Sequence, residues 1–288
     1  CGSGSPRTTA RDGAGVQDNR LMRRAMEYAV GLGVTLAQHC EDDALCGGGH
    51  MHEGEWSARL GIAGQPAEAE ELMVMRDIAL ARLTGCRIHF QHLSTARSVA
   101  MVREALAAGL PVTAEATPHH FTLTHAACAG YDPVFKVNPP LRTEADVAAV
   151  RAGLADGTIA TIATDHAPHT PESKELPFDQ APPGMIGLET ALALALTELD
   201  LPLPQLLAAL SWNPAKVAGI DDVHGRPVAE GEPANLCVID PDATWTVRAD
   251  AMASRSRNIP YEGREVRGRV RHTVLAGEPV VIDAEAQR

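Results

Sequence analysis

An acidic residue followed closely by two histidines stands where a short apolar run ends. Residues 158–163 are typical of a buried strand, and Asp165 follows them, with His166 and His169 close behind. The carboxyl end of a parallel strand is where α/β barrels carry their chemistry. A carboxylate in this place can bind a metal ion and can also move a proton. Asp165 is therefore the first candidate for chemistry in this chain.

Two further strand-like runs end in a histidine: residues 34–39 end at His39, and residues 87–92 end at His92. A neutral imidazole is a good ligand for Zn²⁺, and a strand end fixes the direction of the ring. Either histidine alone is more often a hydrogen-bonded core residue. Two at equivalent strand ends, with Asp165 at a third, favour a metal site.

Other histidines give weaker signals. His50 and His52 are spaced so that, on a strand, both rings could bind one metal, but they lie in a Gly-rich loop with no strand before it. We therefore do not expect this pair to bind a metal. His119 and His120 follow a strand and could face the site, although their position favours capping or packing.

Two proline-containing turns carry groups that could contact a substrate. Residues 138–142 read Asn-Pro-Pro-Leu-Arg, a rigid turn that either presents the Asn138 amide and the Arg142 guanidinium to a substrate or is a plain proline turn. In residues 182–187, Gly184 allows close approach of the backbone, so its N–H is a candidate ligand donor.

Helical and strand-like segments alternate through the first two thirds of the chain, which predicts a parallel sheet with helical crossovers. Long loops after strands and short turns after helices favour a TIM-like (β/α)₈ barrel. The predicted strands are residues 34–39, 87–92, 111–116 and 158–163, with a short apolar run at 134–137, and the predicted helices are residues 18–31, 66–84, 95–108 and 144–154.

We expect three regions: an irregular segment 1–11, a barrel 12–224 and a small all-β unit 225–288, where short segments rich in Val, Pro and Gly replace the alternation. Only four or five βα units can be counted after Asp12, and an open barrel leaves a costly free edge. The chain also starts without Met or an apolar pattern. We therefore expect the barrel to be incomplete at its N-terminus.

The composition excludes several classes of protein. The net charge is −12, from 25 basic and 37 acidic residues, and no dense basic cluster appears, which argues against nucleic acid as a partner. No apolar run is long enough to span a bilayer and no signal peptide appears, so we expect no membrane association. The six cysteines have no regular spacing, which indicates reduced thiols and a cytoplasmic location.

Several motifs together resemble the dihydroorotases of many bacteria, which are cyclic amidohydrolases of pyrimidine synthesis. The resemblance covers roughly residues 12–280. The matching motifs are residues 39–42 (HCED), 91–95 (QHLST), 117–120 (TPHH), 136–142 (KVNPPLR), 163–169 (ATDHAPH), 178–189 (FDQAPPGMIGLE), 213–215 (NPA) and 254–258 (SRSRN). Hydantoinases and allantoinase share the histidines at the strand ends, but usually not the 138–142 and 182–189 motifs in this form.

The resemblance implies a TIM-like barrel with two divalent metal ions, expected to be Zn²⁺. It assigns His39 and His92 to one metal, and Asp165 to the other and to proton transfer. Asp12 matches a bridging carboxylate by its distance before His39, although Arg11 and the residues before it depart from the pattern. It further implies that the substrate contacts are the side chains Asn138 and His169 and the backbone at Pro183 and Gly184.

The implied reaction is reversible hydrolysis of the ring amide of dihydroorotate to N-carbamoyl-L-aspartate by a metal-bridged hydroxide. The family also carries a His-x-His strand followed by an arginine, and no residue before Asp12 matches it, so we expect reduced metal content and little turnover from this chain alone. Two alternatives remain: a hydantoinase-like or allantoinase-like cyclic amidase, and a non-catalytic subunit that supports aspartate carbamoyltransferase. A homo-oligomer or an association with that transferase stays open.

Overall fold

Four short parallel strands lie at the centre of the computed structural model, which describes residues 15–287. Their order in the sheet is β1, β4, β5, β6, so the strands lie side by side in the order in which the chain forms them. Their bounds are Leu36–Gln38 (β1), Ile88–Phe90 (β4), Val112–Ala116 (β5) and Thr161–Ile162 (β6). Each is shorter than the sequence run that predicted it, but all four predicted strands are confirmed, and so is their parallel direction.

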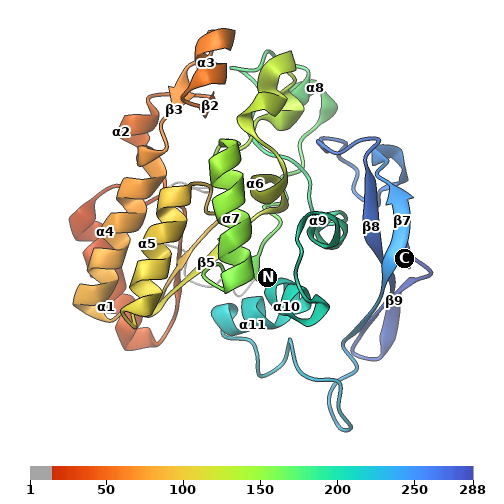
Figure 1. Ribbon diagram of the computed structural model, residues 1–288. Helices are drawn as coiled ribbons and strands as arrows, with labels where there is room; N and C mark the ends of the chain where they lie inside the picture. The colour runs from red at the N-terminus through yellow and green to blue at the C-terminus, as the bar shows by residue number, and fades with distance from the viewer. Residues whose placement is uncertain (1–14, 288) are drawn as a thin grey trace.

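Four helices stand side by side along the outside of this sheet (Figure 1). They are α1 (Asn19–Leu32), α4 (Glu68–Thr84), α5 (Ala96–Ala107) and α7 (Glu144–Asp156). Asp18 caps α1, because its carboxylate accepts a hydrogen bond of 2.6 Å from the N–H of Leu21. The helix ends at Gly33 rather than at Gly31, since Gly33 adopts the left-handed conformation with φ 65°.

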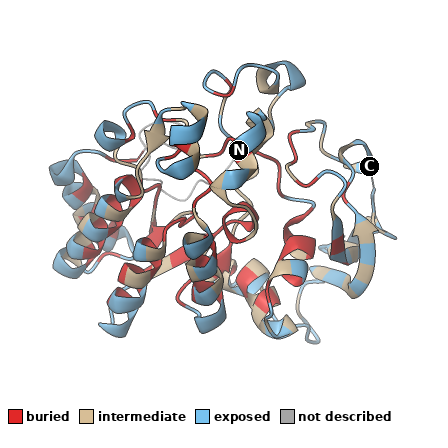
Figure 2. Cartoon of the chain, turned by 45° about the horizontal axis from the view of Figure 1, so that its top comes forward, coloured by how far each residue is buried: buried red, intermediate tan, exposed pale blue. Residues whose placement is uncertain are grey.

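The apolar core lies between these helices and the strands, and the outer faces of the helices are exposed (Figure 2). One cluster joins α1, α4 and α5 to β1, β4 and β5, with Met26, Val74 and Phe90 fully buried. A second cluster continues under α7, where Val150 is fully buried. Truncation of Phe90 to alanine would cost about 3–5 kcal/mol, so this core fixes the positions of the strand ends.

The segments that follow strands are long, and several gather at one end of the molecule, which is the upper end in Figure 1. The Gly-rich segment around His50 and His52 contains a helix and a strand and leads into a second helix, and the first half of the short apolar run 134–137 lies in a 3₁₀ helix. The elements after β1 are α2 (Asp43–Cys46), β2 (Met51–His52), α3 (Glu55–Leu60) and β3 (Gly64–Gln65). Those after β5 and β6 are α6 (Pro118–Thr122), η1 (His125–Gly130), η2 (Pro133–Phe135) and α8 (Pro171–Lys174).

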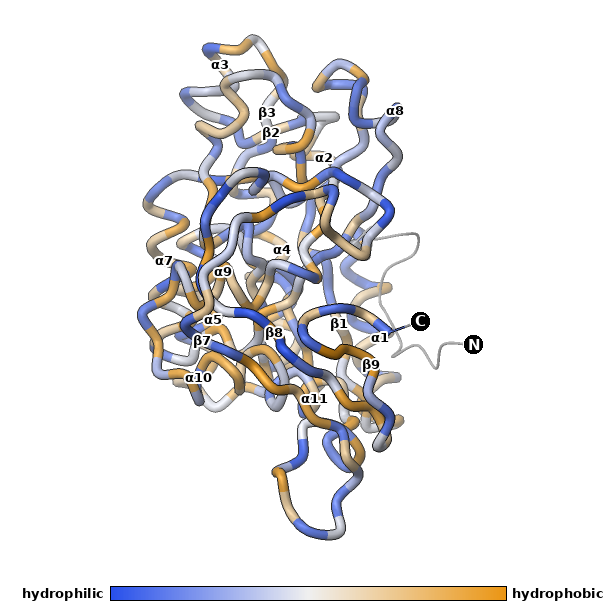
Figure 3. The backbone as a smooth tube through the Cα atoms, turned by 90° about the vertical axis from the view of Figure 1, so that its right-hand side faces the viewer, coloured by the Kyte–Doolittle hydropathy of each residue, from blue (hydrophilic) through white to orange (hydrophobic). Residues whose placement is uncertain are grey.

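The C-terminal part is an antiparallel sheet with strand order β10, β9, β8, β7, which agrees with the predicted all-β unit. It packs on α9 through β8, where Gly268 lies directly against Leu196, and Figure 3 shows the sheet in front of the helices. The helices of this part are α9 (Ala191–Glu198), α10 (Leu203–Leu207) and α11 (Asn213–Ala218), and a π-helical segment, Ala208–Trp212, joins α10 to α11. The strands are β7 (Leu236–Thr246), β8 (Glu265–Leu275), β9 (Glu278–Ile282) and β10 (Glu285–Ala286). A 3₁₀ turn, Ala249–Ala251, follows β7. Within residues 15–287 no helix is long and apolar enough to cross a bilayer.

Candidate functional site

The side chains of His39 and His92 meet at the carboxyl ends of two neighbouring strands. His39 directly follows β1 and His92 lies two residues beyond β4, so the parallel pairing of these strands places both at one edge of the sheet. Nδ1 of His39 is 2.9 Å from Nε2 of His92, and both residues are buried. The structure therefore brings together the two histidines that the sequence analysis selected.

Glu41 fixes the hydrogen-bonding state of this pair. Its carboxylate lies 2.7 Å from Nε2 of His39 and accepts a second hydrogen bond from the Nδ2 amide of Asn138. Burial alone would raise the pKa of Glu41, but the hydrogen bonds from His39 and Asn138 outweigh burial and hold this pKa below its ordinary value. An ionised carboxylate can only accept, so His39 donates to it from Nε2.

One buried nitrogen of His92 is left with no partner. If both rings are neutral, Nδ1 of His39 carries the lone pair and accepts from the Nε2–H of His92. Nδ1 of His92 then holds a lone pair, and it has no hydrogen-bond partner in the described structure. Burial and the neighbouring His39 lower the pKa of His92 well below its ordinary value, which keeps this ring neutral. A neutral, buried and unpartnered imidazole nitrogen is suited to bind a metal ion.

Asp165 lies beyond the end of β6, and its electrostatic environment includes a second carboxylate that the sequence analysis missed, Glu115 of β5. Burial and the charge of Glu115 raise the pKa of Asp165, while His39 acts in the opposite direction. Glu115 lies 2.9 Å from Nε2 of His89 and accepts from the backbone N–H of His92 at 3.3 Å. The available signal was a charged residue inside an otherwise uncharged strand of small side chains, Val112–Ala116.

The backbone is strained where two of these residues sit. His92 has φ 33° and Asp165 has φ 45°, both in the left-handed region that side chains with a β-carbon rarely adopt. Such conformations persist only where the surroundings hold them, and they cluster at functional sites. This observation supports a functional role for both positions.

The predicted substrate-binding residues fall into two groups. Asn138 joins the histidine pair through Glu41. His169 instead contacts the turn at Pro183, whose carbonyl oxygen lies 3.0 Å from its Nε2. The N–H of Gly184 was expected to be free for a ligand, but it donates to the carbonyl of Lys136 at 2.8 Å. A β-carbon at position 184 would lie 2.8 Å from Nε2 of His169, so the close packing here requires glycine.

The guanidinium of Arg142 does not face a substrate, contrary to one reading of the proline turn. Arg142 is only 3% exposed, and its Nη1 lies 3.1 Å from both Nδ1 of His52 and the carbonyl of Gln65. His52 lies in β2, so a short strand does hold it, yet its ring is bonded to Arg142 instead of pairing with His50. His50 contacts Lys136.

Of the adjacent histidines in α6, His120 has a structural role. Its Nδ1 lies 2.8 Å from the hydroxyl of Thr117, and its Nε2 lies 3.0 Å from the carbonyl of Pro139. His119 is equally buried, and its Nε2 has no partner in the described structure. The hydrogen bonds of His120 agree with the packing role expected for it, and the role expected for His119 stays a prediction.

The donor set partly fits a divalent metal. Two imidazoles converge, one of them has an unpartnered nitrogen, and the charge of His39 acts to lower the pKa of Asp165. Within the described residues no three His, Cys, Asp or Glu side chains are grouped closely enough to hold a metal. Asp12, the predicted bridging ligand, lies outside the described residues.

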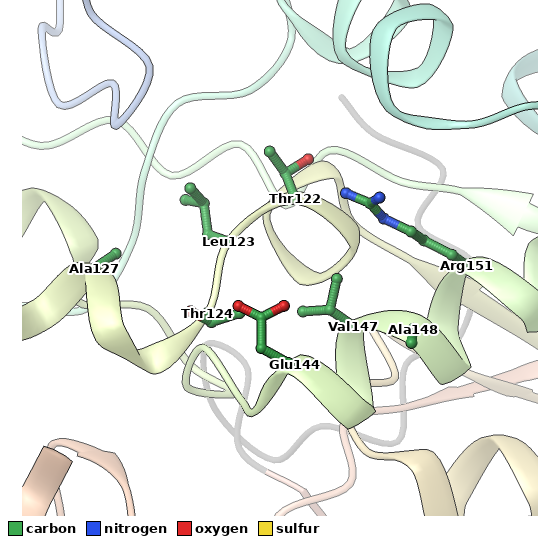
Figure 4. Close-up of a pocket in the computed structure, with 8 residues that line it drawn as sticks. All are labelled: Thr122, Leu123, Thr124, Ala127, Glu144, Val147, Ala148 and Arg151. Atoms are coloured by element: carbon green, nitrogen blue, oxygen red, sulfur yellow. The ribbon is translucent and has the colours of Figure 1, made fainter. Parts of the chain in front are cut away.

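One hollow lies away from these residues. It has a volume of about 340 Å³ and is formed by α6, the turn after it and α7 (Figure 4). Its lining includes Thr124, Glu144 and Arg151, and none of the predicted site residues. Nothing in its lining resembles a metal or catalytic centre.

Comparison with solved structures defines the class of this fold. The L-hydantoinase (dihydropyrimidinase) from Arthrobacter aurescens matches with a TM-score of 0.87 and 25% identity, covering 98% of this chain and 65% of that structure. A D-hydantoinase (dihydropyrimidinase) from Thermus sp. matches with a TM-score of 0.84 and 25% identity, covering 98% and 64%. The fold is that of the TIM-barrel amidohydrolases, which confirms the predicted fold class.

Comparison with curated sequences then shows the family. A family model described as dihydro-orotase-like matches residues 7–98. Dihydroorotases from Pelotomaculum thermopropionicum and Mycobacterium bovis are 52% and 46% identical over 277 and 288 residues, or 94% and 99% of this chain. The chain belongs to the dihydroorotase family of metal-dependent amidohydrolases. It spans 64% and 67% of the length of these two relatives.

Proposed function

We propose that this chain carries the metal-binding and substrate-binding part of a dihydroorotase. The reaction is the reversible hydrolysis of the ring amide of dihydroorotate to N-carbamoyl-L-aspartate, in de novo pyrimidine synthesis. The observation that carries the proposal is the contact of His39 with His92 at one edge of the sheet, where the end of β6 also brings Asp165. The names of the curated relatives supply the substrate.

Of the two metal ions expected in a complete site, His39 and His92 would hold one and Asp165 the other, with Asp12 as a further ligand; Zn²⁺ is the expected metal. A bound divalent ion of this kind lowers the pKa of water and polarises a carbonyl. Glu41 would orient the His39 ring through its hydrogen bond to Nε2. Such carboxylate–histidine contacts fix the tautomer of a ligating imidazole.

Asp165 would carry the proton in the reaction. In the metal-free chain, burial and the charge of Glu115 raise the pKa of this carboxyl group. The proton would move from the attacking water to Asp165 and then to the departing ring nitrogen. Asn138 and His169 would orient the ring, which is a contribution of proximity.

A second candidate function is that of a hydantoinase or dihydropyrimidinase, because the similar solved structures carry those names. The two substrates differ in the carboxylate that dihydroorotate carries on its ring.

The proposal also includes a cytoplasmic location. Self-association and association with aspartate carbamoyltransferase are left to be tested.

The test is to load the chain with Zn²⁺ and compare dihydroorotate with 5-substituted hydantoins, by calorimetric binding and by ring-opening assays. We expect dihydroorotate and N-carbamoyl-L-aspartate to bind more tightly than any hydantoin. Asp165→Asn should leave binding in place and remove any turnover. A preference for hydantoins, or no binding of either compound class, would contradict the proposal.

A further inference from the structure

A buried carboxylate lies beside the turn that carries His92. Glu70 belongs to the first turn of α4 and is only 2% exposed. A charged group is costly to bury unless hydrogen bonds compensate for its lost hydration. The partners of Glu70 therefore indicate what the group is there to hold.

All the hydrogen bonds described for the Glu70 carboxylate come from two consecutive residues of that turn. The backbone N–H of Ser94 lies 3.1 Å from both carboxylate oxygens, and the backbone N–H of Thr95 lies 3.2 Å from one. The hydroxyl of Ser94 donates a third hydrogen bond to the same carboxylate. Charge-assisted hydrogen bonds of this kind are stronger than neutral ones, so Glu70 clamps the turn just after His92.

Arg142 holds the same serine from another direction. Its Nε donates to the Ser94 hydroxyl at 3.0 Å, so this hydroxyl accepts from Arg142 and donates to Glu70. Arg142 stands four residues after Asn138, in the turn that carries the proposed substrate amide. Ser94 thus joins the His92 turn to the Asn138 turn.

The clamp coincides with the strained residue. His92 has φ 33°, and its own N–H donates to the Glu115 side chain, while the N–H of Leu93 donates to the Glu115 backbone carbonyl at 2.9 Å. The N–H groups of the next two residues, Ser94 and Thr95, donate to Glu70, so every backbone N–H from His92 to Thr95 makes a hydrogen bond. A strained conformation persists where its surroundings over-determine it in this way.

Stability alone is a weak reason for this arrangement. Well-packed apolar side chains in place of buried charged groups are often neutral or stabilising, because the charges lose their hydration. The clamp instead acts on the direction of one side chain. Outer partners that orient a ligating residue typically change metal affinity by about 10- to 100-fold when they are removed.

We propose that Glu70 is a positioning residue that, through Ser94 and Thr95, fixes the turn from which the His92 imidazole meets His39. The functional meaning of this positioning rests on the function proposed above. Arg142 acts with Glu70 and couples the His92 turn to the Asn138 turn. None of these residues touches the reacting atoms.

The experiment compares Glu70→Gln and Ser94→Ala with the wild-type chain. Glu70→Gln removes the charge at nearly constant shape, and Ser94→Ala cuts the link to Arg142 without removing a buried charge. Glu68→Gln is the matched control, because Glu68 lies in the same first turn of α4 but is exposed. The first measurement is the histidine ring ¹⁵N spectrum of the metal-free chain, and the second is Zn²⁺ affinity by chelator competition.

We expect Glu70→Gln and Ser94→Ala to shift the ring nitrogen signals of His92 and His39 and to weaken Zn²⁺ binding about 10- to 100-fold. Glu68→Gln should change neither, and circular dichroism should show the same fold in all four proteins. Unchanged ring signals in both variants would overturn the positioning role, whatever the metal affinity. Shifted ring signals in a chain whose wild type binds no Zn²⁺ would support the positioning role and contradict the proposed function instead.

Discussion

The imidazole rings of His39 and His92 meet edge to face, with their centroids 4.7 Å apart and their planes inclined by 78°. The two residues are 53 positions apart in the chain, and the pairing of β1 with β4 brings them together. Because both residues follow strands of the sheet, the sheet fixes the position of the proposed metal site.

Removal of either imidazole should therefore weaken metal binding. We expect His39→Ala and His92→Ala each to reduce Zn²⁺ affinity at least about 100-fold, because a direct ligand contributes more than the outer partners that orient it. Isothermal titration calorimetry checks this expectation. His272→Ala, in the C-terminal sheet, is the control, and equal losses in all three variants would rule out a specific role for the pair.

Asp165→Asn should impair chemistry more than binding. Asparagine keeps the size of the side chain but cannot carry the proton, so we expect kcat to fall about 100- to 10,000-fold in any metal-loaded form that turns over dihydroorotate. KM should change much less. Asp242→Asn, at an exposed position, should have no effect. A large rise in KM with unchanged kcat would show that Asp165 only binds substrate.

Gly184→Ala should damage the proposed substrate site. A β-carbon there would lie 2.7 Å from Cβ of Ala167 and 2.8 Å from Nε2 of His169, so the His169 ring must move. Gly157→Ala is the matched control, because Gly157 also has a positive φ, 81°, but open space around it. Both variants should lose about 1 kcal/mol or more in urea unfolding. Only Gly184→Ala should weaken the binding of N-carbamoyl-L-aspartate.

Stability should fall in mild acid. Burial, followed by the charge of Arg142, lowers the pKa of His52 to about 4, and burial lowers that of His120 to about 4. The unfolded chain binds protons near the ordinary pKa of 6.5, so the folded state loses stability as pH falls from about 6.5 to about 4. From pH 7 to pH 5 each histidine would contribute a loss of roughly 2 kcal/mol at most.

Urea unfolding at several pH values measures this dependence. His52→Asn keeps an acceptor for Arg142 but cannot titrate, so its stability should decline less steeply between pH 7 and pH 5 than that of the wild type. Identical slopes for the two proteins would show that His52 is not a source of the acid sensitivity.

The strand ends could be predicted from the sequence because short apolar runs and the polar residues after them are local signals. His39, His92 and Asp165 were found in this way, and the structure places them at one edge of the sheet. The predicted strands were too long, because the regular ladder covers only part of each run, although flanking residues such as Ala160 and Ala163 still hydrogen-bond to β5.

The supporting residues could not be predicted, because their roles depend on contacts between distant segments. Glu70 reads as one acid among several at the start of an exposed helix, yet it bonds to residues 24 and 25 positions away. Arg142 and His52 are 90 positions apart. No local pattern distinguishes a buried guanidinium from one that faces a substrate.

The left-handed backbone at His92 and Asp165 has a consequence for inactivation by heat. Each residue would relax to a commoner conformation as soon as its neighbours loosen, and this requires only local opening rather than global unfolding. Warming should therefore misdirect these two side chains while the helices are still intact. Function would fade at temperatures below the cooperative melting of the domain.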